Sequence, residues 1–386
     1  MNIENQIIRD GYDRKTCWVH PRCGIIPAQN GSSPVGVMTM WKTRLTGNDT
    51  FSETSDLRTE DGGKTWDGPT PQKNLWRRPL SEGRDEGACD WTPRWHAASG
   101  KLINIGHSVV YHNDEVALSE RKTVYSVYDP TSRIWSSFKK LAFPESLREK
   151  FYNEGAGCVQ SVELGNGQLL IPTYFAIDSP GGDPFERDYA VTVLRCSFDG
   201  ETLRYIDHGD ELRAPADSGR GFSEPSICEV NGRFYLTLRN DNSACVAVGD
   251  DGLHFSPPKN WCWDDGGELG SYNTQQHFLV HEGGLHLVYT RRGADNDHVF
   301  RHRAPLFIAE VNQESLRIVR DSEQILAPNR GARLGNFGVT KYGENEYWIT
   351  VAEWMQAAGP EPICFDSTIC EKYGSNNAIY LVRVRF

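Results

Sequence analysis

Residues 59–66 read Thr-Glu-Asp-Gly-Gly-Lys-Thr-Trp, and this stretch decides the fold class. Asp61 is placed to accept hydrogen bonds from the backbone of its own turn, and Gly62 and Gly63 supply dihedral angles that other residues rarely adopt. Trp66 ends the stretch with a large side chain that can fill the gap between two sheets. The pattern predicts a tight turn that joins two strands and packs against a neighbouring sheet.

Weaker copies of this turn recur in residues 126–135, 197–202 and 249–255. The central aspartates of the four turns are Asp61, Asp129, Asp199 and Asp251, separated by 68, 70 and 52 residues. A period of this size is typical of the blades of a β-propeller. Six blades would leave about 64 residues for each blade, enough for four strands and their loops.

Short runs of β-branched, aromatic and aliphatic residues lie between these turns and predict buried strands. They are residues 35–41, 101–105, 168–174, 233–239 and 285–289. The last eight residues, 379–386, also predict a strand, which we expect to join the first blade and close the ring. Because no linker or low-complexity stretch divides the sequence, we expect one all-β domain over residues 1–386, a six-bladed β-propeller.

Composition narrows the classes of function. Asp and Glu number 52 against 41 Lys and Arg, a formal net charge of −11, which argues against a nucleic-acid-binding surface. No apolar run is long enough to span a membrane, so we expect no membrane partner. The sequence gives no indication of oligomeric state.

The first residues lack the basic and apolar regions of a signal peptide. We therefore expect a cytoplasmic protein, with a secreted protein that has lost its signal as the alternative. The ten cysteines include no Cys-x-x-Cys pair, which predicts reduced thiols and no structural zinc site. We expect neither a metal nor a cofactor.

Between residues 20 and 355 the sequence resembles the bacterial sialidases, in which the turn of residues 59–66 is known as an Asp-box. Residues 20–27, His-Pro-Arg-Cys-Gly-Ile-Ile-Pro, are similar to the opening Arg-Ile-Pro segment of that family. Residues 223–232, Ser-Glu-Pro-Ser-Ile-Cys-Glu-Val-Asn-Gly, resemble the segment that carries its catalytic glutamate. The resemblance implies a sialidase-like β-propeller and an exo-acting glycosidase that releases a terminal acidic sugar, such as sialic acid, from a glycan.

The resemblance also implies a triad of arginines that grips the substrate carboxylate. Arg22 matches the first and Arg239, fifteen positions after Glu224, matches the second. Arg303 matches the third, with Arg301 as its rival. Guanidinium groups suit this role because they form bidentate, charge-assisted hydrogen bonds with carboxylates.

Three further positions receive roles from the resemblance. Glu224 is implied as the catalytic glutamate that activates the nucleophile. Glu353 is implied as the residue that braces Arg22, and Gln276 as a substrate-binding residue near the third arginine. Both glutamates would also relieve the repulsion among the arginines.

Two positions depart from the family. Asn336 stands where the family has its nucleophilic tyrosine, and an amide cannot form the covalent glycosyl intermediate. Water or a hydroxyl from Tyr174, Tyr342 or Tyr347 would have to replace it. The acid/base aspartate of the family precedes the first Asp-box, where Asp49 is the candidate.

Three histidines indicate an alternative chemistry, in which a histidine acts as the catalytic base. His20, His96 and His107 lie near predicted inner strands, with Asp90 and Tyr111 close in sequence. A histidine can remove the proton α to a carboxylate, and a tyrosine can protonate the leaving oxygen. The alternative function is therefore a uronate-specific lyase or uronic-acid glycosidase that uses His107 or His20. A non-catalytic glycan-binding propeller, in which the lost tyrosine marks a lost activity, is the third possibility.

Overall fold

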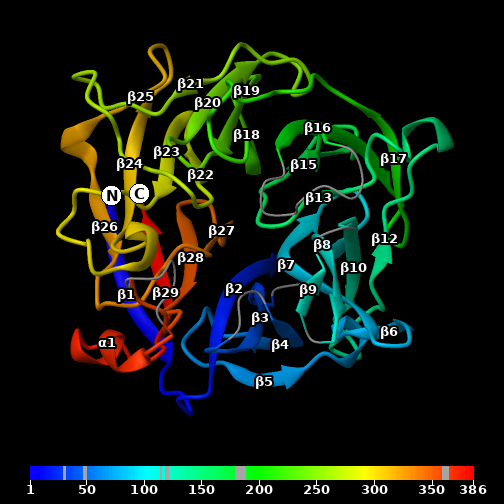
Figure 1. Ribbon diagram of the computed structural model, residues 1–386, viewed down its shortest axis with the longest axis horizontal. Coiled ribbons are helices and arrows are strands. Elements are labelled where there is room, and N and C mark those ends of the chain that lie inside the picture. The colour runs from blue at the N-terminus through cyan, green and yellow to red at the C-terminus, as the bar shows by residue number, and fades with distance from the viewer. Residues whose placement is uncertain (29–31, 47–49, 114, 118–120, 179–187, 359–364) are drawn as a thin grey trace.

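The computed structural model describes residues 1–28, 32–46, 50–113, 115–117, 121–178, 188–358 and 365–386. The described strands form six antiparallel sheets, and Figure 1 shows them arranged around a central axis. The fold is an all-β propeller, as the sequence predicts. In Figure 1 each sheet has one strand near the axis and other strands further out.

The first three sheets follow one another along the chain. The first contains β2 (Thr16–Ile26), β3 (Val35–Arg44), β4 (Phe51–Thr59) and β5 (Asp67–Pro71). The second contains β6 (Arg78–Ser81), β7 (Arg84–His96), β8 (Lys101–His112), β9 (Glu115–Ala117), β10 (Thr123–Asp129), β11 (Ile134–Trp135) and β12 (Lys139–Lys140). The third contains β13 (Glu154–Gly155), β14 (Val162–Glu163), β15 (Leu169–Ala176), β16 (Tyr189–Phe198) and β17 (Leu203–His208).

The other three sheets complete the ring. The fourth contains β18 (Ser223–Val230), β19 (Arg233–Arg239), β20 (Cys245–Gly249) and β21 (Lys259–Asn260). The fifth contains β22 (His277–His281), β23 (Gly284–Tyr289), β24 (Leu306–Asn312), β25 (Arg317–Ile318) and β26 (Gln324–Ala327). The sixth contains β27 (Gly338–Lys341), β28 (Glu346–Ala352), β29 (Ile379–Arg385) and β1 (Asn2–Arg9).

Helical segments are short among the described residues. They are α1 (Ser367–Lys372) and the 3-10 turns η1 (Lys73–Leu75), η2 (Glu145–Leu147), η3 (Phe300–His302) and η4 (Arg320–Ser322). None of the described helices is long and apolar enough to cross a membrane.

The two ends of the chain meet in the sixth sheet. β29 pairs with β28 on one side and with β1 on the other, with Asn2 opposite Arg385. The prediction that residues 379–386 join the first blade is therefore wrong. The N-terminal strand instead joins the last sheet, which closes the ring by β-sheet hydrogen bonds and leaves β2 as the inner strand of the first sheet.

The turn of residues 59–66 lies between β4 and β5 and has the hydrogen bonds that its sequence predicts. The side chain of Asp61 accepts from the backbone N–H of Lys64 and Thr65, each at 3.0 Å. Gly62 and Gly63 have φ of 74° and 77°, in the left-handed region. The ring of Trp66 lies 6.0 Å from that of Trp348 on β28, so the turn packs against the neighbouring sheet.

The weaker copies also join neighbouring strands: Asp129 ends β10 before β11, Asp199 lies between β16 and β17, and Asp251 lies between β20 and β21. Asp129, Asp199 and Asp251 each accept a hydrogen bond from a backbone N–H two residues ahead. Asn312, at the end of β24, does the same for Glu314 and Ser315. The sequence analysis missed this fifth turn because its acceptor is an amide and its glycine is absent.

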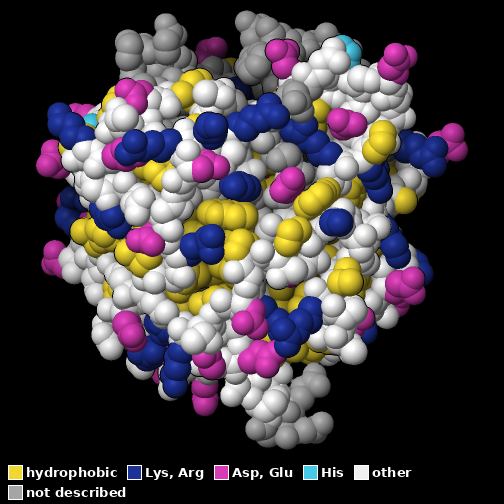
Figure 2. Space-filling view, turned by 90° about the horizontal axis from the view of Figure 1, so that it is seen from below, with side chains coloured by type: hydrophobic (Ala, Val, Ile, Leu, Met, Phe, Trp, Pro, Cys, Tyr) yellow, Lys and Arg dark blue, Asp and Glu magenta, His cyan; other side chains and the backbone are white. Residues whose placement is uncertain are grey.

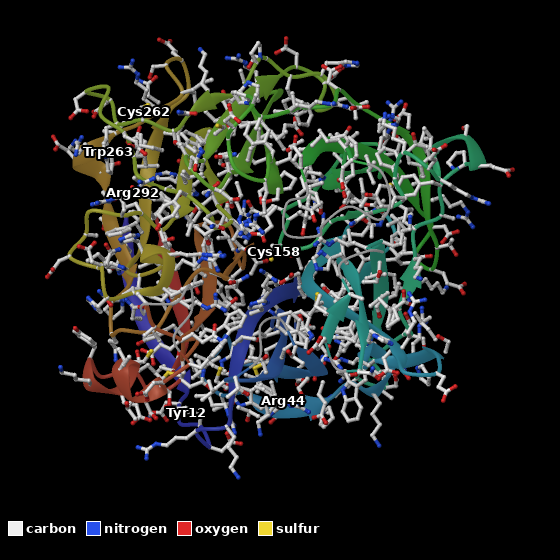
Figure 3. The ribbon with its side chains drawn as sticks, in the orientation of Figure 1. Tyr12, Arg44, Cys158, Cys262, Trp263 and Arg292 are labelled. Atoms are coloured by element: carbon white, nitrogen blue, oxygen red, sulfur yellow. The ribbon has the colours of Figure 1, made fainter. Side chains whose placement is uncertain are left out.

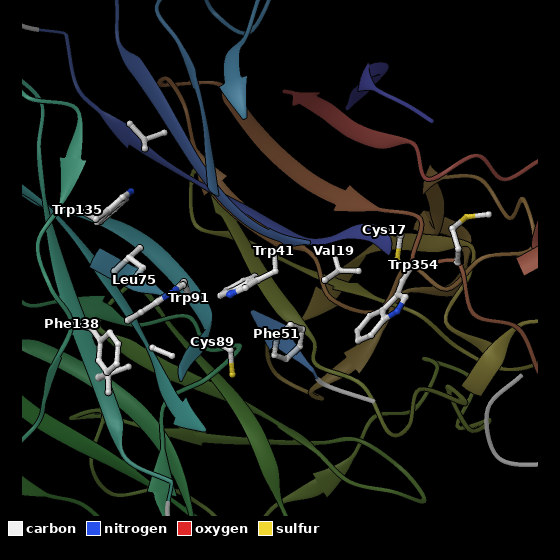
Figure 4. Close-up of a cluster of buried hydrophobic side chains, with 14 of the residues drawn as sticks. Cys17, Val19, Trp41, Phe51, Leu75, Cys89, Trp91, Trp135, Phe138 and Trp354 are labelled. Atoms are coloured by element: carbon white, nitrogen blue, oxygen red, sulfur yellow. The ribbon is translucent and has the colours of Figure 1, made fainter. Parts of the chain in front are cut away.

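Aromatic side chains fill the spaces between sheets. Trp41, Trp91, Trp135 and Trp354 belong to one buried cluster, part of which Figure 4 shows, and none is more than 3% exposed. The cluster joins the first sheet, the second sheet and the segment after β28. Since each Å² of buried apolar surface contributes about 25 cal/mol, these contacts hold the sheets at fixed positions around the axis.

Charges of both signs are interspersed on the face that Figure 2 shows.

Replacing Trp348 by alanine tests the packing between the first and sixth sheets. Trp348 is fully buried, and its ring stacks on that of Tyr342 at 4.2 Å. We expect the free energy of unfolding to fall by about 3–5 kcal/mol, measured by chemical denaturation. Ile134→Ala is the control, because Ile134 is 48% exposed, and it should change stability by no more than about 0.5 kcal/mol. Similar losses in both variants would contradict this account.

Candidate functional site

Polar side chains from different sheets come together near the axis. Arg22 lies on β2, Asp90 on β7 and Glu224 on β18, while Arg303 follows η3. Cys158, between β13 and β14, lies near the axis in Figure 3. Arg22 and Arg303 are buried, and the side chains of Asp90 and Glu224 are no more than 14% exposed. The site is therefore a charged cluster that is largely shielded from water.

Three inner strands bulge at the residues that form this cluster. The strand register shifts between Val19 and Arg22, between Cys89 and Thr92, and between Ser223 and Ser226. Within the bulges His20, Asp90 and Glu224 have φ of 52°, 55° and 41°. Such a backbone costs about 1–3 kcal/mol at a non-glycine residue, and a bulge redirects a side chain. Repetition in three sheets indicates that the strain serves the site.

Arg22 has a protein partner for every guanidinium nitrogen. Its Nε donates to the Phe337 carbonyl at 3.1 Å and its Nη1 to the Trp91 carbonyl at 3.3 Å. Its Nη2 donates to the Gln275 side chain at 2.8 Å and to Cys158 Sγ at 3.0 Å. Burial raises the pKa of the Cys158 thiol well above its usual range, so this sulfur supplies no counter-charge.

Asp90 is the carboxylate that faces Arg22. Its Oδ1 lies 2.8 Å from His20 Nδ1 and 3.8 Å from Arg22 Nη1, and its Oδ2 lies 3.4 Å from His107 Nε2. Burial opposes ionisation, but His20, His107 and Arg22 hold the pKa of the Asp90 carboxyl well below its usual range. Asp90 is therefore ionised and neutralises Arg22.

His107 links Asp90 to Tyr174. Its Nδ1 lies 3.5 Å from the Tyr174 hydroxyl, so the hydroxyl can donate to the ring while Nε2–H donates to Asp90. Burial, and then the nearby Arg121, lower the pKa of His107 to about 3. The imidazole is thus neutral at physiological pH and can accept a proton only weakly.

Glu224 and Arg239 form a second neutral pair. Arg239 Nη1 donates to Glu224 Oε1, and Arg239 Nη2 donates to the side chain of Asn273. The two residues are neighbours because Ser223 pairs with Arg239 across the β18–β19 hairpin. Burial alone would raise the pKa of Glu224, but the Arg239 guanidinium outweighs it and the pKa is lowered.

Arg303 donates its hydrogen bonds to uncharged groups. Its Nη2 donates to the Asn273 carbonyl and its Nη1 to the Asn336 side chain at 3.4 Å, and no described carboxylate forms a salt bridge with it. The Nε atoms of Arg303 and Arg239 are buried without a hydrogen-bond partner in the described part of the chain.

The electrostatic surroundings of Arg303 also indicate that it lacks a negatively charged partner. Burial, followed by the charges of Arg301, Arg239 and Arg333, lowers the pKa of Arg303 well below its usual range. Arginine keeps its charge in proteins. The lowered pKa of Arg303 therefore indicates that its surroundings do not compensate its positive charge, which a bound anion would stabilise. Arg301 is less buried than Arg303, and its guanidinium lies over the Phe300 ring at 4.8 Å.

Two predicted site residues have other partners. Glu353 accepts hydrogen bonds from the backbone of Asn376 and Ala378 and from the Tyr380 hydroxyl, so the prediction that it braces Arg22 is wrong. Gln276 is fully buried and bonds to Thr237, Ser271 and Thr274. Adjacent residues of an extended chain point in opposite directions, and it is Gln275 that contacts Arg22.

Asp49, the predicted acid, lies outside the described residues. Of the three tyrosines considered as replacements for Asn336, Tyr174 alone contacts the cluster. Tyr342 stacks on Trp348, and the Tyr347 hydroxyl donates to the Val280 carbonyl.

One group of side chains has the spacing of a metal site. Single ligand atoms of Cys89, Asp90 and His107 lie within 4.8 Å of one another. Asp90 already faces Arg22, however, and a divalent cation would have to share that carboxylate with a buried guanidinium. We therefore assign the group to the hydrogen-bonded cluster.

Sequence reasoning missed several residues of the cluster. Asn273, Gln275 and Arg121 carry no motif, and their positions depend on bulges and on contacts between sheets. Asp90 was named only for its closeness in sequence to the histidines and was given no role.

Comparisons with known proteins support the fold. No protein-family model matches this sequence, and no curated protein is similar enough to match it. Among solved structures, a protein of unknown function from Dyadobacter fermentans DSM 18053 has a TM-score of 0.66 and 15% identity, covering 100% of this chain and 99% of that one.

Two sialidases share the fold as well. The Hadza microbial sialidase Hz136 has a TM-score of 0.64 and 12% identity, covering 99% of this chain and 68% of that one. The Trypanosoma rangeli sialidase has a TM-score of 0.60 and 16% identity, covering 96% of this chain and 55% of that one. The chain thus has a β-propeller fold like that of sialidases and spans about half of the trypanosomal protein.

The state of His107 can be tested by the pH dependence of stability. The unfolded chain takes up a proton at a pKa of 6.5, whereas the folded pKa is about 3. Below pH 6.5 the unfolded chain is protonated at this histidine while the folded protein is not. The free energy of unfolding therefore has its full value above pH 6.5 and decreases as the pH falls towards 3. Between pH 6.5 and 5 this loss amounts to about 2 kcal/mol, so His107→Gln should flatten the fall in thermal midpoint.

Exposed His112 gives the matched control, and His112→Gln should keep the wild-type slope. An unchanged slope in His107→Gln would mean that the folded protein protonates His107 as readily as the unfolded chain does.

Proposed function

We propose that this protein is an exo-acting glycoside hydrolase of sialidase type, which releases a terminal acidic sugar from a glycan. We further propose that each of the six sheets is one blade of the propeller and that the Asp61 turn is an Asp-box. One observation carries the function: Arg303 is buried beside Arg239 and has no carboxylate of the described chain to neutralise it. A sugar carboxylate supplies the missing charge.

The substrate carboxylate would bind between Arg303 and Arg239. Both guanidiniums retain unpaired Nε–H groups, and charge-assisted hydrogen bonds are strong where water is excluded. Asn336, which already contacts Arg303, would border the same sugar. Arg22 would act through its neighbours, because its own donors are committed to Phe337, Trp91, Gln275 and Cys158.

Glu224 would be the general base. In the free protein Arg239 stabilises its ionised form and so weakens it as a base. A bound carboxylate would compete for Arg239 and add a second negative charge, and both effects raise the pKa of Glu224 towards the range that base catalysis needs. Water activated by Glu224 would attack the anomeric carbon directly, with Asp49 as the proposed acid, and the configuration would invert.

A uronate lyase or uronic-acid glycosidase is the second candidate, favoured by the chain of contacts from Asp90 through His107 to Tyr174. His107 would remove the proton α to the carboxylate and Tyr174 would protonate the leaving oxygen. We rank this candidate lower because the low pKa of His107 makes it a weak base. His20 is packed against the rings of Trp41, Phe51 and Trp354.

Incubation with sialosides and uronate-capped oligosaccharides distinguishes these candidates. We expect products that have gained one water, detected by mass spectrometry, with wild type and not with Glu224→Gln. Products without added water that absorb in the ultraviolet would transfer the assignment to a lyase. Binding without turnover, equal in both proteins, would indicate the non-catalytic glycan-binding propeller.

Arg303→Gln tests the carboxylate contact itself. Loss of a charged hydrogen-bond partner costs about 2–3 kcal/mol, so kcat/KM for an acidic substrate should fall roughly 30- to 150-fold. Arg301→Gln is the matched control on the same turn and should stay within about threefold of wild type. Equal losses in the two variants would remove Arg303 from its proposed role.

A further inference from the structure

We propose that Arg121 forms a second anion site in the same cluster of polar side chains, so that the preferred glycan carries two acidic groups. One group is the terminal carboxylate at Arg303, and the other is a carboxylate or sulfate ester on the adjoining part of the glycan. This inference rests on the proposed function and specifies its substrate class.

The Arg121 guanidinium packs against aromatic rings and not against carboxylates. Its central carbon lies 4.6 Å from the ring centroid of Tyr174 and 5.6 Å from that of Tyr189. Its Nη1 is buried without a hydrogen-bond partner, and no carboxylate in the described part of the chain forms a salt bridge with it. Stacking on rings fixes the plane of a guanidinium without using its N–H donors.

Tight packing at Gly155 fixes the stem of Arg121. A β-carbon at Gly155 would lie 2.5 Å from Arg121 Cδ and 2.7 Å from His107 Cβ, so only glycine fits there. Arg121 is thus pressed against the residues that join Asp90 to Tyr174.

Two arginines of the cluster, Arg303 and Arg121, form no salt bridge with a described carboxylate, whereas Asp90 neutralises Arg22 and Glu224 neutralises Arg239. Arg303 is buried and Arg121 is half-buried. Because a buried charge without a counter-ion is costly, we expect these two cations to favour a ligand with two negative charges.

Crystals of the full chain soaked in selenate locate the anion sites by anomalous scattering. We expect one peak within hydrogen-bond distance of Arg303 and another at Arg121 Nη1. A peak at Arg303 alone would overturn the second site and leave the proposed function intact. A peak at neither arginine would overturn both, whereas a peak at Arg121 alone would support the second site and contradict the proposed carboxylate site.

Titration of matched oligosaccharides with one and with two uronate units gives the functional test. Arg121→Gln should weaken binding of the diacidic ligand at least about tenfold and leave the monoacidic ligand within about twofold. Arg303→Gln should weaken both ligands. Arg121→Lys keeps the charge and should recover part of the preference, while exposed Arg133→Gln should resemble wild type. Equal effects of Arg121→Gln on both ligands would overturn the proposal.

Discussion

Positive charge buried at the axis is the constraint on which this molecule depends. A guanidinium removed from water must find an anion or its burial costs several kcal/mol. Asp90 meets this need for Arg22 and Glu224 meets it for Arg239. Arg303 and Arg121 have no such described carboxylate, and we propose that an acidic ligand supplies the missing negative charge.

The fold makes this arrangement possible at the cost of local strain. His20, Asp90 and Glu224 adopt left-handed backbone within bulges of three inner strands. Each such residue costs about 1–3 kcal/mol, which the buried aromatic contacts between sheets must offset. Closure of the ring through β1 and β29 adds a continuous strand pairing between the two ends of the chain. A strained polar centre therefore sits inside a rigid apolar ring.

Features that depend on local sequence patterns were predicted correctly, whereas features that depend on contacts between sheets were not. The Asp61 turn depends on hydrogen bonds within a few residues, and Glu224 and Arg239 are brought together by a single hairpin. Glu353 and Gln276 were misassigned because their surroundings depend on neighbouring sheets and on which way one residue points. Asp90 and Arg121 carry no motif, and their significance appears only when the charges around the axis are compared.

The central claim is that the pocket recognises the negative charge of a sugar carboxylate. Calorimetric titration of N-acetylneuraminate and glucuronate, each beside its carboxyl methyl ester, tests this claim most directly, because esterification removes the charge and keeps the ring. The account predicts that at least one acid binds about tenfold or more tightly than its ester, and that added salt reduces the difference. Equal binding of acid and ester would contradict it.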